Sequence, residues 1–185
     1  MLLSFFQWLE STPWSIRILE SLYVWPLLET THVLSLGLFV GTAVMMDLRL
    51  LGLAFRGIPA SEFTTRMLPW TKVGFAILVV TGLILFYSSP VRYYHNIFFR
   101  IKTILLILAG LNVWFFHSRV HKRIAEWGHE PVPPRAARFA AAFSIFAWAG
   151  VVVTGRMIAY NWFDCDMQPQ PEFINWAASC LTPTP

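Results

Sequence analysis

The stretch GFAILVVTGLILFY, residues 74–87, decides the class of fold, and TILLILAGLNVWFF, residues 103–116, repeats its character. Neither stretch contains a charged side chain. A helix needs about 20 mostly apolar residues to cross a hydrocarbon core of roughly 30 Å. Runs of this kind, extended by their apolar flanks, are typical of membrane-spanning helices and are hard to explain in a small soluble protein.

Working outward from these runs, we expect four spans, at about 22–46, 70–89, 97–118 and 137–160. Only 13% of the 185 residues are charged and 56% are apolar, whereas soluble domains carry about 25% charged residues. This composition excludes a disordered or nucleic-acid-binding chain despite the net charge of +4. The short connections predict an all-α, integral membrane, four-helix up-down bundle.

The segments before and after the spans are predicted to be an interfacial helix and a tail. In residues 1–20, Leu2, Phe5, Phe6 and Leu9 share one side at helical spacing, which indicates an amphipathic helix lying in the membrane interface. The four-helix transmembrane domain is expected over 21–160, and a C-terminal tail over 161–185.

The basic residues predict the orientation. Four Lys and Arg lie in the first connection and five in the third, which together is nine of the fourteen. Because cytoplasmic loops are enriched in these residues, we expect both termini to be extracytoplasmic. Cys165 and Cys180 would then lie in an oxidising compartment and form a disulfide, the alternative being two free thiols.

The first span carries polar side chains that are costly inside a membrane. Glu29 and His32 are three residues apart and therefore adjacent on one helical face. His32 is a candidate ligand of a metal or haem, with Glu29 holding its second ring nitrogen. The same pair would suit a proton relay to a quinone or an ion path. The structural alternative is a histidine that only bonds a neighbouring helix.

Further polar residues lie toward the other side of the membrane. His117 and His121 are four residues apart and would face one metal ion, or they are simply residues of a basic boundary. We expect Asn112, in mid-span, to form an interhelical hydrogen bond. Asp47 and Arg49 are interpreted as a local cap and ion pair.

At the end of the last span, Arg156 and Tyr160 are four residues apart and face the same way. The arginine would neutralise Glu29, hold a haem propionate or a lipid phosphate, or anchor the helix by reaching outward to the interface. The small residues Gly37 and Gly41 are interpreted as a site of close helix packing.

Depth limits the possible haem geometries. His32 and His117 lie on parallel helices near opposite sides, roughly 15–20 Å apart along the membrane normal at 1.5 Å per residue, so one iron cannot bind both. The absence of a CxxCH motif excludes covalent c-type haem. Beside His32 the second position would be taken by His95 or Met157 or would stay open, and beside His117 the candidates are Met45, Met46 and Met67.

Several motifs together carry a resemblance: ETTHVLSLGLFVGT at 29–42, DLRLLGLAFR at 47–56, LNVWFFH at 111–117 and GRMIAY at 155–160. From about residue 6 to 160 the chain resembles bacterial four-helix inner-membrane proteins catalogued as a domain of unknown function. The resemblance implies the fold but no activity. More loosely, the layout is similar to small cytochrome b-type bundles and copper-resistance membrane domains, and function does not follow from fold.

Three hypotheses for function remain open. The first is a subunit for haem b-binding or quinone-linked electron transfer, with His32, Glu29, Arg156, Tyr160 and His117 as its site residues. The second is a cofactor-free accessory subunit that docks through aromatic surfaces. The third is a metal or proton transporter that would need to form an oligomer. In each case the partners are membrane lipid and a second protein or a second copy, with no nucleic acid, and the chain is not expected to be a stand-alone enzyme.

Overall fold

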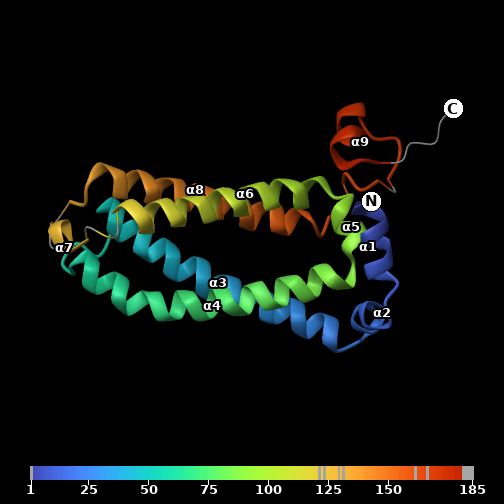
Figure 1. The fold of residues 1–185 in the computed structure, drawn as a ribbon, viewed down its shortest axis with the longest axis horizontal. Coiled ribbons are helices and arrows are strands. Elements are labelled where there is room, and N and C mark those ends of the chain that lie inside the picture. The colour runs from blue at the N-terminus through green and yellow to red at the C-terminus, as the bar shows by residue number, and fades with distance from the viewer. Residues whose placement is uncertain are drawn as a thin grey trace.

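The computed structural model describes residues 2–120, 122, 124–128, 130, 132–160, 162–165 and 167–180. Four long helices dominate it (Figure 1). They are α3 (Val24–Leu51), α4 (Ala60–Ser88), α6 (Ile97–Phe115) and α8 (Arg135–Met157). Each is long and apolar enough to cross a membrane, α6 together with the turn that follows it. Within the described residues there is no strand, so the predicted all-α membrane bundle is confirmed.

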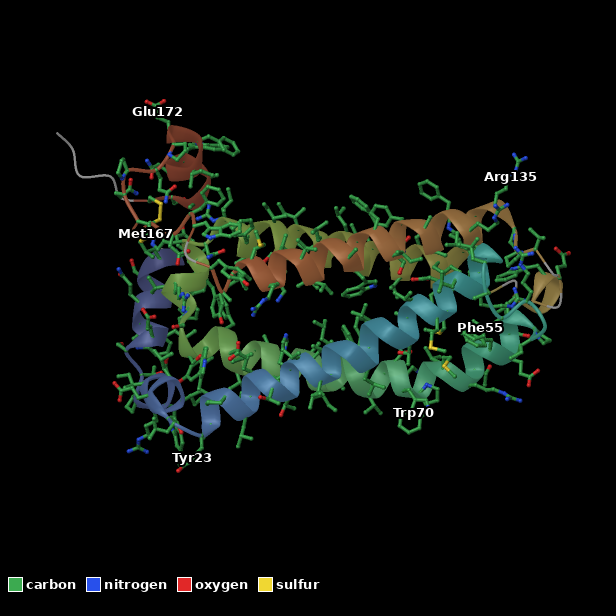
Figure 2. All side chains as sticks on the ribbon, turned by 180° about the vertical axis from the view of Figure 1, so that it is seen from behind. Tyr23, Phe55, Trp70, Arg135, Met167 and Glu172 are labelled. Carbon is green, nitrogen blue, oxygen red and sulfur yellow. A yellow bond between two sulfur atoms is a disulfide. The ribbon has the colours of Figure 1, made fainter. Side chains whose placement is uncertain are left out.

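The short elements gather at the two ends of the bundle (Figure 1). One end, here called the terminal end, carries α1 (Leu2–Glu10), α2 (Pro13–Glu20), α5 (Pro90–Tyr94) and α9 (Glu172–Ala178). The other, here called the loop end, carries the π-helical turn η1 (Phe116–Val120) and α7 (Ile124–Trp127). In Figure 2, Tyr23 and Met167 lie at the terminal end, and Phe55 and Arg135 at the loop end.

The first two long helices continue past the apolar segments that predict them. α3 runs on to Leu51, where Gly52 adopts a left-handed conformation with φ of 71° and caps the helix. α4 begins at Ala60, so Pro69 lies inside the helix and not near its start. Helix length and hydrophobic length therefore differ here, because polar turns extend the helices beyond the segment that lipid would cover.

The helices pack in a row. α3 packs on both α4 and α8, and α8 packs on α6. The described residues of α4 and α6 form no comparable interface. The order α4–α3–α8–α6 therefore leaves the side between α4 and α6 unclosed by helix packing.

Two glycines mark where the helices approach most closely. A Cβ atom at Gly74 of α4 would lie 2.9 Å from the backbone nitrogen of Phe39 on α3. One at Gly150 of α8 would lie 2.8 Å from a methyl group of Leu105 on α6. The expectation for Gly37 and Gly41 is wrong within this chain, because no described atom lies within 4 Å of a Cβ at either position; both are on an exposed side of α3.

An aromatic layer crosses the middle of the bundle. We define it as Phe39, Phe75 and Trp148. The ring of Phe39 meets that of Trp148 edge-on at 4.6 Å and lies 5.4 Å from that of Phe75. Nearer the loop end, the Asn112 amide donates to the backbone carbonyl of Ala140 at 3.0 Å, which confirms the predicted hydrogen bond between α6 and α8.

The C-terminal tail is fastened to the start of α6. Cys165 and Cys180 are joined by a disulfide. The Arg100 guanidinium donates to the carbonyl of Ala177 at 2.6 Å, and the side chain of Asn96 donates to that of Asp164 at 2.9 Å. The tail is thus held at the terminal end by bonds from one helix and by its own crosslink.

Candidate functional site

His32 is oriented by a hydrogen bond across to α4. Its Nδ1 lies 2.9 Å from Oγ1 of Thr81. The Thr81 hydroxyl donates its single proton to the carbonyl of Ile77, one turn earlier, at 2.7 Å. When the hydroxyl donates there, its oxygen accepts from Nδ1–H and Nε2 keeps its lone pair; in the other tautomer the hydroxyl donates to Nδ1 and Nε2 carries the proton.

The other long helices contribute to the same level of the bundle. A Cβ at Gly82 of α4 would lie 3.2 Å from Cε1 of His32, so the ring packs against a glycine. Lys102 of α6 lies close enough for its charge to act on His32. Its ammonium nitrogen would be 3.5 Å from a Cβ at Gly155 of α8. We call these five residues the His32 site.

Sequence reasoning did not find Thr81 or Lys102. In the sequence, Lys102 is one of the five Lys and Arg outside the first and third connections, and this count does not assign it to a site. The available signal is its place in α6, five residues after the first helical residue, Ile97, and directly before a charge-free run. No described residue forms a hydrogen bond or ion pair with its ammonium group. A cation so placed is suited to an anionic or carbonyl-bearing ligand.

Glu29 does not hold the second ring nitrogen of His32, contrary to the prediction from the sequence. It is exposed, and in the described structure no hydrogen bond joins it to His32. Its charge acts instead on Tyr93 of α5. The group that orients the imidazole is Thr81, from the neighbouring helix, because the two partners there face one another across a packed interface.

Arg156 and Tyr160 form the expected pair on one side of the chain. The guanidinium donates to the phenol oxygen at 3.3 Å and lies 5.2 Å from the centre of the ring. Both side chains are exposed, and the Tyr160 ring stacks on Trp162 at 5.4 Å. This surface arrangement is typical of an interfacial anchor.

His117 is far from the His32 site. It is an exposed residue of the π-helical turn η1. It follows Lys102 by fifteen residues on a continuous helical segment, which corresponds to about 22 Å at 1.5 Å per residue. The two histidines therefore belong to separate sites. π-Helical turns are rare and frequent at functional positions. The predicted partner, His121, lies outside the described residues.

The loop end buries two charged side chains. Asp47 is 8% exposed and Arg49 is 2% exposed. The predicted ion pair between them is wrong, because residues two apart on a helix point to different sides. Arg49 donates through Nε to the carbonyl of Ile58 at 2.7 Å, which ties down the following loop. One oxygen of Asp47 and one terminal nitrogen of Arg49 have no described partner.

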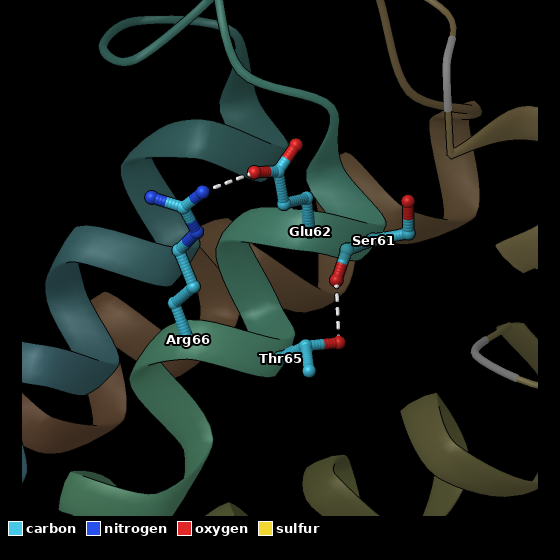
Figure 3. A network of polar contacts seen from close by, with 4 residues as sticks. All are labelled: Ser61, Glu62, Thr65 and Arg66. Carbon is cyan, nitrogen blue, oxygen red and sulfur yellow. Dashed lines mark hydrogen bonds and ion pairs between the residues drawn. The ribbon is translucent and has the colours of Figure 1, made fainter.

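Within the described residues, one ion pair is present. Arg66 and Glu62, one turn apart at the start of α4, approach to 2.5 Å (Figure 3). Beside them the Thr65 hydroxyl donates to the carbonyl of Ser61 at 2.9 Å. Both charged groups are largely exposed, so the pair contributes only a few tenths of a kcal/mol.

The ligand chemistry at the His32 site is limited by its donors. No group of three or more His, Cys, Asp or Glu side chains converges among the described residues, so a metal ion held by protein ligands alone has no convergent set there. Haem iron needs only one or two protein ligands. A single histidine with a free Nε2 lone pair fits that requirement, and a neighbouring cation fits the carboxylates of haem.

These features define a class: a multi-pass membrane protein with an oriented histidine in its interior. The family of unknown function DUF6644 matches residues 5–161, and the chain belongs to it. This agrees with the resemblance to an uncharacterised family found in the sequence. No curated protein matches the chain, and no solved structure matches it.

Proposed function

We propose that the chain is an electron-transfer subunit that binds haem b through Nε2 of His32. The observation that carries this proposal is the 2.9 Å contact of Nδ1 with Thr81, whose own bond to the Ile77 carbonyl leaves its oxygen able to accept from Nδ1–H. An axial histidine ordinarily donates its second ring N–H to a fixed acceptor, which sets the tautomer and the ring plane. Bound haem would supply one-electron chemistry.

Lys102 supports the same function. Its ammonium group would neutralise a carboxylate of the macrocycle, a role that the sequence assigned to Arg156. Gly82 and Gly155 allow the imidazole and the lysine side chain to pack closely against α4 and α8, since neither position has a side chain. The protein's own contribution is to bind, to orient the imidazole and to hold a positive charge near the site.

The aromatic layer favours electron transfer over ion transport. It lies between the His32 site and buried Asp47, and packs Phe39 against Trp148 without a polar group between them. An ion or proton would need a polar or hydrated path through this layer, whereas an electron does not. His117, on the far side of the layer, would belong to a second site.

The test is a reduced-minus-oxidised visible spectrum of the protein purified in mild detergent from cells supplied with haem. We expect a b-type α band that is lost in His32→Ala and retained in His117→Ala. In His32→Ala the Thr81 hydroxyl keeps its bond to Ile77, so the substitution leaves no buried donor unpaired on α4. A featureless spectrum of the wild-type protein, or loss only in His117→Ala, would overturn the assignment.

A second candidate function is a cofactor-free accessory subunit. The tail favours it, because Phe173 and Trp176 lie one turn apart on α9 and are 66% and 78% exposed. Such aromatic side chains suit the surface of a partner protein, a second copy or the membrane interface. A partner that co-purifies with haem-free protein and is lost on Trp176→Ser would support this alternative.

The orientation belongs to the proposal as well. The basic residues of the first and third connections support a cytoplasmic loop end. The disulfide supports an oxidising environment at the terminal end. Both fit an inner membrane with extracytoplasmic termini. A membrane-impermeant thiol reagent, applied to intact cells after reduction, should label Cys165 and Cys180.

A further inference from the structure

A cavity of about 270 Å³ lies at the terminal end of the bundle. Its walls come from four helices and are almost wholly carbon. The residues that matter here are Phe6 of α1, Phe86 of α4, Tyr93 of α5, and Phe99 and Ile104 of α6. The cavity therefore lies where α4 and α6 meet through the rings of Phe86 and Phe99, although the two helices form no extended interface.

The cavity is close to the His32 site. Phe86 follows Gly82 by one helical turn on α4, and Phe99 precedes Lys102 by three residues on α6. A ligand in the cavity would therefore lie about one turn, or roughly 5 Å, along the helices from the level of His32. A molecule dissolved in the bilayer would reach it from the side, between α4 and α6.

The walls favour a flat ligand. The rings of Phe86 and Phe99 are 5.5 Å apart and inclined by 13°, and those of Phe86 and Tyr93 are 6.0 Å apart and inclined by 28°. At these separations no further ring fits between them, so the three side chains form one stacked aromatic wall, and a planar ring would pack offset against its face. The volume is slightly below the range of about 300–1,000 Å³ for drug-sized ligands, which indicates a single ring and excludes a macrocycle.

Although carbon dominates the walls, the lining residues Tyr93, Tyr94 and Arg100 have polar ends that suit a carbonyl oxygen. The Tyr93 hydroxyl has no hydrogen-bond partner among the described residues. Burial raises the pKa of Tyr93, Glu29 raises it further and Arg92 opposes them, so the phenol remains a donor at neutral pH. Arg100 lies over Tyr94 at 5.0 Å and gives this wall a fixed positive charge, while its nitrogens are engaged by backbone carbonyls such as that of Ala177.

We propose that this cavity binds the headgroup of a lipophilic quinone, with Tyr93 donating a hydrogen bond to a quinone carbonyl. The stacked aromatic wall, the unpartnered phenol of Tyr93 and the nearby cation together fit this chemical class. A lipid acyl chain would fill the same volume but would gain nothing from the phenol. The inference rests on the proposed function, because a haem subunit within a membrane needs a membrane-soluble redox partner.

The first test fills the cavity. Ile104 lines it, whereas Ile107 lies about one turn further along α6 and does not, and both are 58% exposed. The probe is a benzoquinone with a decyl tail, titrated into the detergent-purified protein and followed by calorimetry. Ile104→Trp should weaken binding at least tenfold, whereas Ile107→Trp should bind like the wild type. Equal affinities in the two variants would overturn the proposal.

The second test removes only the donor. Tyr93→Phe keeps the ring and should weaken binding of the same quinone about three- to tenfold, the worth of one hydrogen bond. Decanol is the matched probe without a headgroup. If decanol competes as strongly as the quinone, or Tyr93→Phe changes nothing, the cavity is an acyl-chain groove and the proposal fails.

Haem binding at His32 and quinone binding in the cavity can be refuted separately. His32→Ala should abolish the haem band and leave quinone affinity unchanged, whereas Ile104→Trp should do the reverse. Quinone binding by a protein without a haem band would refute the proposed function and support the cavity as a quinone site. A haem band in a protein that does not bind the quinone would do the opposite.

Discussion

Replacing Thr81 by valine tests the central bond of the His32 site. Valine matches threonine in shape but has no oxygen, so Nδ1–H of His32 loses its acceptor at 2.9 Å. The net worth of such a bond is about 0.5–1.5 kcal/mol, and a half-buried donor left unpaired costs about 1–3 kcal/mol. We therefore expect Thr81→Val to lower the free energy of unfolding by about 1–2 kcal/mol.

Thr81→Val should also weaken binding of the proposed haem. Loss of a group that orients a ligating histidine typically reduces affinity 10–100-fold, and haem titration of the apoprotein would measure this. Thr81→Ser restores the hydroxyl and should recover most of both effects. Nitrogen NMR of labelled histidine would follow the tautomer of His32 without any ligand.

The matched control is Thr31→Val. Thr31 also bonds a carbonyl one turn earlier on its own helix, that of Leu27 at 2.7 Å, but it is exposed and its hydroxyl reaches no other helix. Its replacement should be nearly neutral. If Thr81→Val and Thr31→Val are equally stable, and the tautomer of His32 is unchanged, the reasoning about the site is refuted.

Three further predictions concern packing, titration and the tail. Gly74→Ala should destabilise the protein by about 1–3 kcal/mol in a denaturant titration, because its Cβ would meet the backbone of α3; Gly37→Ala has open space and should be neutral or stabilising by up to about 1 kcal/mol. Burial raises the pKa of Tyr93 in the folded protein. The contribution of Tyr93 to the free energy of unfolding is therefore complete below the ordinary tyrosine pKa of about 10 and is lost as pH rises through the folded pKa. Tyr93→Phe should flatten the alkaline limb of a stability–pH curve, and an unchanged limb would contradict this. Reduction of the disulfide should open the loop closed by Cys165 and Cys180, which has a sequence separation of 15, and proteolysis of the tail should become faster. Cleavage at the same rate before and after reduction would show that Arg100 and its neighbours hold the tail without the crosslink.

Composition was sufficient to predict the class of fold. Long uncharged runs such as residues 74–87 permit few structures in a membrane, so the four spans follow directly. The hydrogen bond of Asn112 also followed, since a mid-span amide has few partners other than a neighbouring helix. These inferences depend on what a residue is and how deep it lies, and both can be obtained from the sequence.

The packing contacts and site residues that the sequence did not predict depend on the rotation of each helix about its axis. Gly37 and Gly41 have the spacing of a packing motif, yet the close approaches occur at Gly74 and Gly150. Lys102 lies at the His32 site because of the face of α6 that carries it, and Thr81 orients His32 because of the register between α3 and α4. One sequence fixes neither the rotation nor the register.

The packing order has a consequence for how the protein is made. α3, the first span, meets the second hairpin mainly through α8, the last span. The His32 site draws on residues from 32 to 155, so most of the chain must be synthesised before the site exists. Each hairpin can insert as a unit, but the site is completed only when the final helix leaves the insertion machinery. Binding of the proposed haem would therefore be a late event in biogenesis, and truncation before α8 would yield a membrane-inserted protein with an unfinished site.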